Sequence, residues 1–404
     1  MNNKICIVIS GLSIGGAQRR AVTLANAFAR KGFAVNILAL SSDESIEESY
    51  FKTEENVELT VASRCFDNNS AVKIESAIKK ICIVFFKLVI RLLDILHVQS
   101  NDIKFLIRSL RKSTGLYSYF KASGCSAIIS FEFDIFDRVY WPAKHSGAKI
   151  IYAETNSSKR YEKNSFAKQI EKLIQKSDAM VLQTREEMLE HNLEHCNSAY
   201  VIHNPIKESL PERYTGERQK LIVNFCRMTK QKNLLLLIQA FEKFAHEKPD
   251  YELKIYADLT MDSNGEYQGE LLRYVAEHNL EKSVHILPAV PDIHEKILDA
   301  AMFVSSSDFE GISNSMIEAM AIGLPCVCTD CAGGGAREMI TDGENGLLTP
   351  VGDVDKLSEA MIRMISEDGL AEKCGNNAAK IRETHSVEKI AEQWLQVIDS
   401  VSKK

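Results

Sequence analysis

The chain has 404 residues, of which 45% are hydrophobic and 26% are charged, and its formal net charge is −6. This length fits two domains of ordinary size, and the composition excludes a disordered chain. No run of 18 uncharged apolar residues occurs, so no membrane-spanning helix is expected. Ten scattered cysteines, and a start at Met1 that leads directly into a predicted strand, favour a cytoplasmic protein.

Charge is unevenly distributed along the chain. Residues 1–200 contain 27 Lys+Arg against 22 Asp+Glu, and the remainder contains 22 against 33. The segment Lys73–Lys121 has ten basic and three acidic residues. A basic half predicts an anionic partner, which could be nucleic acid, a membrane surface or a phosphorylated acceptor. Within this segment, Ile81–Leu93 is too short and too charged to span a bilayer. It either lies in a membrane interface or belongs to a pair of long helices that cover a sheet.

Short apolar runs alternate with amphipathic segments, which predicts two consecutive βαβ series. The first series opens with a strand, a glycine-containing turn, a helix and a strand, at Ile5–Ser10, Gly11–Ala17, Gln18–Lys31 and Phe33–Leu40. Its later strands are predicted at 127–131, 149–152, 179–183 and 199–202. A linker follows at 206–219. The second series has predicted strands at 221–225, 252–256, 284–287, 301–304 and 326–329.

We therefore predict an α/β protein with two Rossmann-like, doubly wound domains that face each other across a cleft. The first domain covers residues 1–205 and is joined by a C-terminal helix within 387–404, and the second covers 206–386. Ligands of such folds bind at the carboxyl ends of the strands.

The most informative segment runs from Glu310 to Glu318, between a buried strand and a helix that ends before Gly323. The two acids are eight residues apart, about two helical turns, so both can face the same side. Backbone amides at Ser313 to Ser315 would lie at a helix N-terminus, which binds anions. A phosphate cradle with two carboxylates suits a ligand that has a diphosphate and several hydroxyls, such as a nucleotide-sugar.

Two basic residues follow the first strand of the second series. Arg227 and Lys232 are placed at the carboxyl end of that strand, where a guanidinium and an ammonium can bind a diphosphate. The alternative is a solvated basic turn.

These motifs, in this order, resemble the family 4 glycosyltransferases of GT-B architecture. The resemblance rests on Gly15-Gly16, Arg227-x4-Lys232 and Glu310-x7-Glu318, and is most specific over Phe309–Gly346. Within the family, the chain is similar to enzymes that build polysaccharide or glycan repeat units. It departs from the family at Ala257-Asp258, where a glycine pair is usual.

The resemblance implies a retaining hexosyl or N-acetylhexosaminyl transferase that uses a nucleotide-sugar, with UDP as the expected nucleotide, and requires no metal or other cofactor. Arg227 and Lys232 would bind the diphosphate, Glu310 the donor sugar and Glu318 the ribose. The remaining donor contacts would come from glycines and backbone amides, at Gly15, Gly16, Gly311, Ile312, Ser313 and Asn314. Glu154 and Asn156 are acceptor-site or sugar-contact candidates, and a local cap is the alternative for Glu154.

The expected partners are a nucleotide-sugar, a glycan or lipid-linked acceptor and an anionic membrane surface, without nucleic acid. The protein is therefore expected at the cytoplasmic face of a membrane. Other GT-B enzymes, such as an epimerase or a phosphorylase, and a non-catalytic binding protein are alternatives. Metal sites at His191-x-x-Glu194-His195, at Cys326, Cys328 and Cys331, or at Asp353-x-Asp355 are disfavoured, and Asp353 or Asp355 is expected to cap a helix instead.

Overall fold

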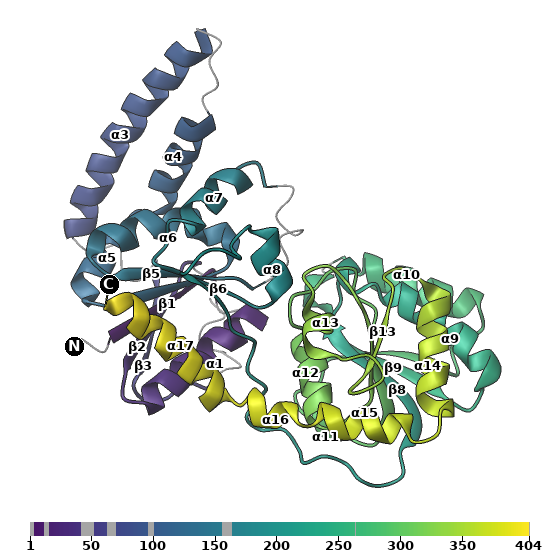
Figure 1. The fold of residues 1–404 in the computed structure, drawn as a ribbon. Helices are drawn as coiled ribbons and strands as arrows, with labels where there is room; N and C mark the ends of the chain where they lie inside the picture. Colours follow the sequence, from purple (N-terminus) through teal and green to yellow (C-terminus); the bar gives the residue numbers. More distant parts are fainter. Residues whose placement is uncertain are drawn as a thin grey trace. The chain divides into compact units, whose positions relative to one another are not determined.

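The computed structural model describes residues 4–11, 16–41, 52–62, 70–95, 101–155, 164–262 and 264–403. The chain divides into two compact units (Figure 1). Unit 1 comprises Met1–Gln183, Met188–Ile202 and Val387–Lys404, and unit 2 comprises Thr184–Glu187 and His203–Ser386. The chain therefore passes between the units near His203 and again near Ser386.

Unit 1 is built on a seven-stranded sheet with the order β3-β2-β1-β4-β5-β6-β7. Each pairing between its described strands is parallel. The strands are β1 (Lys4–Ile9), β2 (Ala34–Ala39), β3 (Val57–Val61), β4 (Ala127–Phe131), β5 (Lys149–Ala153), β6 (Ala179–Leu182) and β7 (Ala199–Val201).

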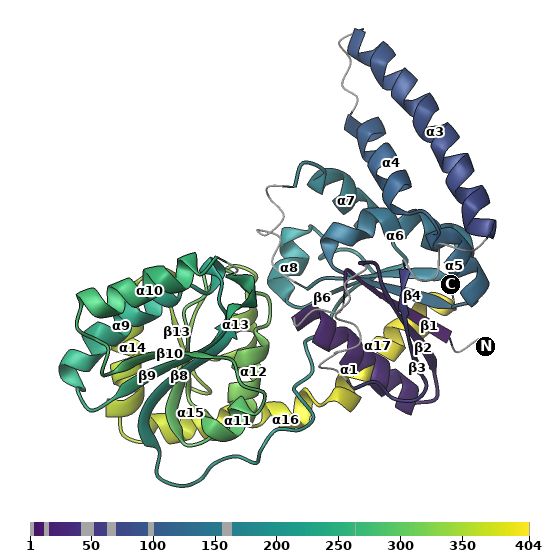
Figure 2. The same ribbon diagram turned by 180° about the vertical axis from the view of Figure 1, so that it is seen from behind.

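Helices cover both faces of this sheet. Alternate residues of β1 enter opposite cores, because side chains in a strand point to the two faces in turn: Ile5 and Ile7 lie in one core, and Cys6 and Val8 lie in the other. The first face is covered by α1 (Gly16–Arg30) and by the C-terminal helix α17 (Val387–Ser402), which lie side by side (Figures 1 and 2). Helices α5 (Leu116–Ser123), α6 (Phe133–Ser146) and α7 (Ala167–Ile174) cover the other face.

Two further helices in the described part of unit 1 are α3 (Ser70–Ile95) and α4 (Asn101–Lys112). Helix α8 (Arg185–Glu190) is divided between the units, because Thr184–Glu187 belongs to unit 2 and Met188–Ile202 to unit 1. Helix α4 packs on α6, and α3 packs on α4 and α5. The basic segment thus contains the predicted pair of helices, but the sheet face beneath it is covered mainly by α5 and α6.

Unit 2 is built on a six-stranded sheet with the order β10-β9-β8-β11-β12-β13, again with parallel pairings. The strands are β8 (Gln219–Arg227), β9 (Glu252–Asp258), β10 (Val284–Pro288), β11 (Ala300–Ser305), β12 (Cys326–Thr329) and β13 (Leu347–Thr349). Of the linker predicted at 206–219, residues 206–218 contain no helix or strand, and Gln219 is the first residue of β8.

Two helical layers enclose this second sheet. One core lies under α9 (Leu234–Glu247), α10 (Glu266–Glu277), α14 (Val354–Ser366) and α15 (Leu370–Ala378). The opposite core includes residues of α11 (Ile293–Lys296), α12 (Asn314–Ala321), α13 (Gly335–Met339) and α16 (Ile381–Thr384). Single turns of 3-10 helix, η3 (Lys230–Lys232) and η4 (Leu259–Met261), follow β8 and β9. The prediction of two parallel, Rossmann-like α/β domains is confirmed.

Candidate functional site

Lys232 is positioned by a tight turn at the carboxyl end of β8. The turn η3 ends at Lys232, and Asn233 adopts φ 43° and accepts a hydrogen bond from the Leu236 amide at 3.3 Å, which starts α9. Lys232 is only 8% exposed. Its Nζ lies 2.5 Å from Oε2 of Glu310. A largely buried ammonium is thus compensated by a carboxylate.

Glu310 follows β11, which is the neighbour of β8 in the sheet. Its carboxylate also accepts a hydrogen bond from Gln231 Nε2 at 3.1 Å, and its amide donates to the Ala332 carbonyl at 2.8 Å. Gln231 additionally donates to the carbonyl of Phe309 at 2.7 Å. The loop carrying Glu310 is therefore fastened to the loop carrying Lys232, as expected for residues at the same edge of a parallel sheet.

Arg227 is the last residue of β8 and is half-buried. Among the described residues, its guanidinium makes no hydrogen bond or ion pair. Lys230, by contrast, is 80% exposed at its side chain and lies 3.8 Å from Glu270. The sequence-predicted pair therefore consists of one cation that is neutralised by Glu310 and one that is available to an anion.

The N-terminus of α12 is held rigidly. Ser313 caps the helix by accepting a hydrogen bond from the Met316 amide at 3.4 Å. Asn204 Nδ2 donates to the Ile312 carbonyl at 3.1 Å and to Asn314 Oδ1 at 3.2 Å. The first amides of a helix have no partner within the helix and carry partial positive charge, so this end can bind an anion.

A glycine contact brings two loops together beside this helix. A Cβ atom on Gly335 would lie 1.8 Å from the carbonyl oxygen of Gly311. Only glycine allows that approach, so the backbone of α13 packs directly against the loop that precedes α12.

Glu318 does not share the described partners of Glu310. It is 3% exposed, and its Oε2 is 2.8 Å from Nε2 of His294 on α11. The His294 ring packs edge-on against Phe225, with ring centroids 5.6 Å apart. Helix α12 begins only at Asn314, so the argument from two helical turns does not apply to Glu310. The structure gives the two acids different partners.

Glu154 is fully buried in unit 1, just after β5. Its carboxylate accepts hydrogen bonds from the Tyr152 hydroxyl and from the Thr155 amide at 2.7 Å, and lies 3.7 Å from His191 Nε2. Burial raises the pKa of Glu154, but attraction to the nearby His191 and the hydrogen bond from Tyr152 outweigh it and leave the pKa below its usual value. As arranged here, this carboxylate has no exposed surface with which to contact a sugar. Asn156 lies outside the described residues.

The N-terminal glycine loop is described only in part. Gly16 is exposed and is the first residue of α1, whereas Gly15 lies outside the described residues. A nearby feature that sequence reasoning missed is Glu132, which follows β4 with φ 74°. Its carboxylate accepts hydrogen bonds from the Ser10 amide at 2.9 Å and from Gln18 Nε2 at 3.3 Å. A positive φ in a non-glycine residue is a strained conformation that marks functional sites more often than other positions.

The disfavoured metal motifs have structural roles. His191 belongs to the contact with Glu154, Cys326 and Cys328 are buried in a hydrophobic core, and Asp353 caps α14 through the Lys356 amide at 2.9 Å. Throughout the described ranges, no group of three or more His, Cys, Asp or Glu side chains is arranged to hold a metal ion.

Comparison with protein families gives a match within unit 2. Residues 206–381 match the family model described as glycosyl transferases group 1. These residues contain Arg227, Lys232, Glu310 and Glu318, whereas the predicted donor contacts Gly15 and Gly16 lie outside the matched part of the chain.

Two bacterial glycosyltransferases are among the sequence relatives. The chain is 25% identical over 265 residues to the poly(glycerol-phosphate) alpha-glucosyltransferase of Bacillus subtilis. The aligned region covers 64% of this chain and 38% of that protein. The chain is 28% identical over 261 residues to the N-acetylgalactosamine-N,N'-diacetylbacillosaminyl-diphospho-undecaprenol 4-alpha-N-acetylgalactosaminyltransferase of Campylobacter jejuni, covering 62% and 69%. The matched region thus spans well under half of the B. subtilis protein.

Similarity in structure extends over the whole chain. The crystal structure of Anabaena HepE in complex with UDP-glucose superposes with a TM-score of 0.74 and 15% identity, covering 98% of this chain and 99% of HepE. The chain thus has the GT-B fold of glycosyltransferases, and its residues 206–381 carry the glycosyl transferases group 1 sequence pattern.

Proposed function

We propose that this protein is a retaining, family 4 glycosyltransferase that moves a hexosyl or N-acetylhexosaminyl group from a UDP-sugar to a glycan acceptor. The observation that carries the proposal is the pairing of Lys232 with Glu310 at the carboxyl edge of the unit 2 sheet. The pair lies in the region that matches the group 1 transferases. The name of the C. jejuni relative contains a diphospho-undecaprenol acceptor, which supports a lipid-linked acceptor at the cytoplasmic face of a membrane.

The proposed donor site divides its charges between the two ends of the donor. Arg227 and the α12 N-terminus would bind the diphosphate, Lys232 would add its ammonium, and Glu310 would contact the sugar. Glu318 would hold the ribose hydroxyls. Negative charge grows on the diphosphate as its bond to the sugar breaks, and preorganised cations and amides stabilise that charge without reorganisation.

The transfer step is proposed to occur on one face of the sugar. The bond from the anomeric carbon to the β-phosphate oxygen breaks while the acceptor oxygen bonds to the same carbon from the same side. The acceptor proton passes to the departing phosphate oxygen, so the configuration is retained and no protein base is needed. The carboxylate of Glu310 would stabilise the positive charge that develops on the sugar ring. We propose that this chemistry requires no metal ion.

A panel of nucleotide-sugars tests the proposal. Thermal shifts with UDP-, GDP- and ADP-sugars should show selective stabilisation by a UDP-sugar, and the stabilising donor should then be supplied with lipid-linked acceptors in the presence of EDTA. Glu310→Gln should remove transfer while retaining the fold. The control is Glu359→Gln, at an exposed carboxylate paired with Lys356, which should behave as wild type.

The outcomes separate the alternatives. Sugar interconversion without an acceptor would identify an epimerase, and unchanged donor binding and turnover in Glu310→Gln would remove Glu310 from the reaction. An inverted product or a strict metal requirement would overturn the proposed mechanism while leaving the enzyme class intact.

A further inference from the structure

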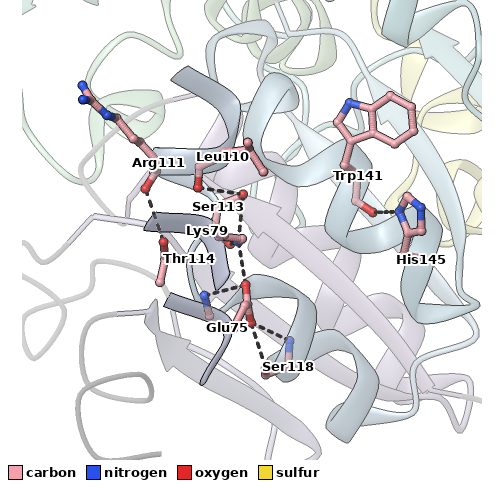
Figure 3. Close-up of polar contacts among 10 residues, drawn as sticks. Glu75, Lys79, Leu110, Arg111, Ser113, Thr114, Ser118, Trp141 and His145 are labelled. Atoms are coloured by element: carbon pink, nitrogen blue, oxygen red, sulfur yellow. Dashed lines mark hydrogen bonds and ion pairs between the residues drawn. The ribbon is translucent and has the colours of Figure 1, made fainter. Parts of the chain in front are cut away.

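Helix α3 is attached to unit 1 along one side and at its base. It packs on α4 and α5, and both helices of this hairpin project from the unit (Figures 1 and 2). At the base, Lys79 Nζ donates to Glu75 Oε1 at 2.6 Å and to the Ser113 carbonyl at 2.7 Å (Figure 3). Glu75 also accepts from the Gly115 amide at 3.0 Å and from the Ser118 hydroxyl at 2.8 Å. This network fixes the base of the helix.

The network also removes the one negative charge of the described part of α3 from its exposed face. Glu75 is the sole acidic residue among positions 72–93, where the α3 side chains are described. Burial raises the pKa of Glu75, but hydrogen bonds from Lys79 and Ser118 outweigh it and hold that pKa below its usual value. The carboxylate is therefore ionised but turned inward and neutralised by Lys79. The exposed face of α3 carries no negative side chain over this range.

An apolar stripe occupies that exposed face. Its residues are between 57% and 72% exposed, namely Ile74, Ile78, Ile81, Phe85, Leu88 and Leu92, with Val84 (59%) beside them. The six positions are separated alternately by four and three residues, so they lie in one line along the helix. From Ile74 to Leu92 the stripe is about 27 Å long. A continuous exposed apolar surface of this length marks an interaction site.

A row of cations runs along one flank of the stripe. Lys73, Lys80 and Lys87 recur at intervals of seven residues, and Arg91 follows one turn later; all four are exposed. Helix α4 adds the exposed residues Lys104, Arg111 and Lys112 to the same hairpin. The described exposed face of α3 thus combines an apolar ridge with positive charge alone, whereas α4 also carries the exposed Asp102.

We propose that the open face of α3, defined by this stripe and this basic row, docks on an anionic phospholipid surface. The inference deepens the membrane-face location in the proposed function, and it specifies the contacting surface. Apolar side chains would enter the acyl boundary while the lysines and Arg91 contact phosphates. The helix would lie in the interface, because no helix in the described part of the chain is long and apolar enough to cross a bilayer.

Charge argues against a second copy as the occupant. Alternating spacings of four and three residues also occur in coiled coils, where ionic pairs flank the seam. Two copies of α3 would offer only cations from the described exposed flanks, because Glu75 is already paired with Lys79. A basic row finds complementary charge on anionic lipid and none on another α3.

Vesicle binding by the full-length protein tests the proposal. Co-sedimentation should be strong with phosphatidylcholine vesicles containing 25% phosphatidylglycerol at low salt, and weak with phosphatidylcholine alone or at 0.5 M NaCl. The charge variant Lys80→Gln/Lys87→Gln/Arg91→Gln and the stripe variant Ile81→Gln/Phe85→Gln/Leu88→Gln should each lower the partition coefficient by about tenfold or more. Both variants should fold normally, because all six substituted side chains are exposed.

Matched substitutions in unit 2 serve as controls. Lys282→Gln/Lys296→Gln/Lys380→Gln removes three exposed lysines, and Leu272→Gln alters a 49% exposed leucine of α10; both should bind vesicles as wild type does. Equal recovery with anionic and neutral vesicles would overturn the proposal. So would a dimer, seen by light scattering, that the stripe variant converts to a monomer without any vesicle binding. Thermal shifts with the UDP-sugar need no vesicles, so failure here is distinguishable from failure of the proposed function.

Discussion

The Lys232 ammonium and the Glu310 carboxylate form an ion pair at 2.5 Å, with side chains only 10% and 16% exposed. Each residue therefore fixes the position of the other, and the pair as a unit carries no net charge. Arg227, which makes no ion pair among the described residues, is the cation of the motif that remains available to an anion. The two cations of the sequence motif should consequently respond differently to substitution.

Arg227→Met should lower kcat/KM by 100-fold or more, an estimate of about 3 kcal/mol for a lost charged contact, with Tm nearly unchanged. Lys232→Met should lose activity and also about 1–3 kcal/mol of stability, because it leaves the Glu310 carboxylate without its ammonium. Kinetics and urea denaturation measure both effects, with the 80% exposed neighbour Lys230→Met as the control. Equal stability losses in the Arg227 and Lys232 variants would contradict this division.

The contact between His294 and Glu318 should favour donor binding, because it holds the Glu318 carboxylate in position. His294→Leu removes the ring nitrogen that lies 2.8 Å from the buried carboxylate, so it should cost about 1–3 kcal/mol and weaken UDP binding. His294→Gln can still donate and should cost less. Calorimetric UDP titration and denaturation check this, with His285→Leu, 34% exposed at its side chain, as the matched control. Unaltered UDP affinity in His294→Leu would separate Glu318 from the nucleotide.

Glu154 and His191 should give unit 1 a stability maximum in mildly acidic solution. The pKa of Glu154 is lowered, as described above. Burial lowers the pKa of His191, but its attraction to the Glu154 carboxylate outweighs this effect and raises that pKa overall. The contribution of Glu154 is present above its unfolded pKa of about 4.3 and is lost as pH falls through its folded pKa. The contribution of His191 is present below about 6.5 and is lost as pH rises through its folded pKa.

The measurement is the difference in unfolding free energy between wild type and Glu154→Gln from pH 4 to 9. That difference should be largest between about pH 4.5 and 6.5. His191→Gln should flatten the alkaline side of the profile. A difference that is constant over the whole range would show that the pair does not titrate as a unit.

His385 should make unit 2 less stable as pH falls. His203 Nδ1 lies 2.8 Å from His385 Nε2, and the ring planes are within 6° of parallel. Burial, and then repulsion from His203, lower the pKa of His385 to about 4. The unfolded chain therefore binds the proton more readily between about pH 4 and 6.5, and stability rises with pH over that window by at most about 3 kcal/mol.

His385→Gln should remove this acidic loss of stability, as judged by urea denaturation at pH 4.5 and 7. His285→Gln, at an exposed histidine of the same unit, is the control and should keep the wild-type slope. The same slope in His385→Gln would assign the acid sensitivity to other groups.

The alternation of apolar runs was sufficient to predict eleven of the thirteen described strands, because the central strands are buried on both faces; β3 and β13 were not predicted. It also placed Lys232 and Glu310 each after a predicted strand, but it did not predict the contact between them. Each follows a strand, and β8 and β11 are neighbours. Residues that follow neighbouring parallel strands meet at one edge.

Other parts of the site could not be read from the sequence. His294 lies on a four-residue helix, which is too short for any periodicity, and its contact with Glu318 depends on how α11 and α12 pack. Nothing in the sequence marks Glu132, because its positive φ is visible only in the backbone of the structure. The burial of Glu154 depends on Tyr152 and His191, which are brought together by β5 and the end of α8. The roles assigned to Glu154, Glu318 and the backbone amides stay predictions.

The placement of α17 has a consequence for biosynthesis. Trp394 is fully buried against the first-face core of unit 1, near Phe131 and the guanidinium of Arg20. Helix α17, which covers part of this sheet face, is thus made only after His203–Ser386 of unit 2, which emerge as one uninterrupted stretch. During translation, this face of unit 1 lacks its α17 cover until the residues after Ser386 have been made, and a nascent chain that stops short of Val387 would expose part of that face to chaperones.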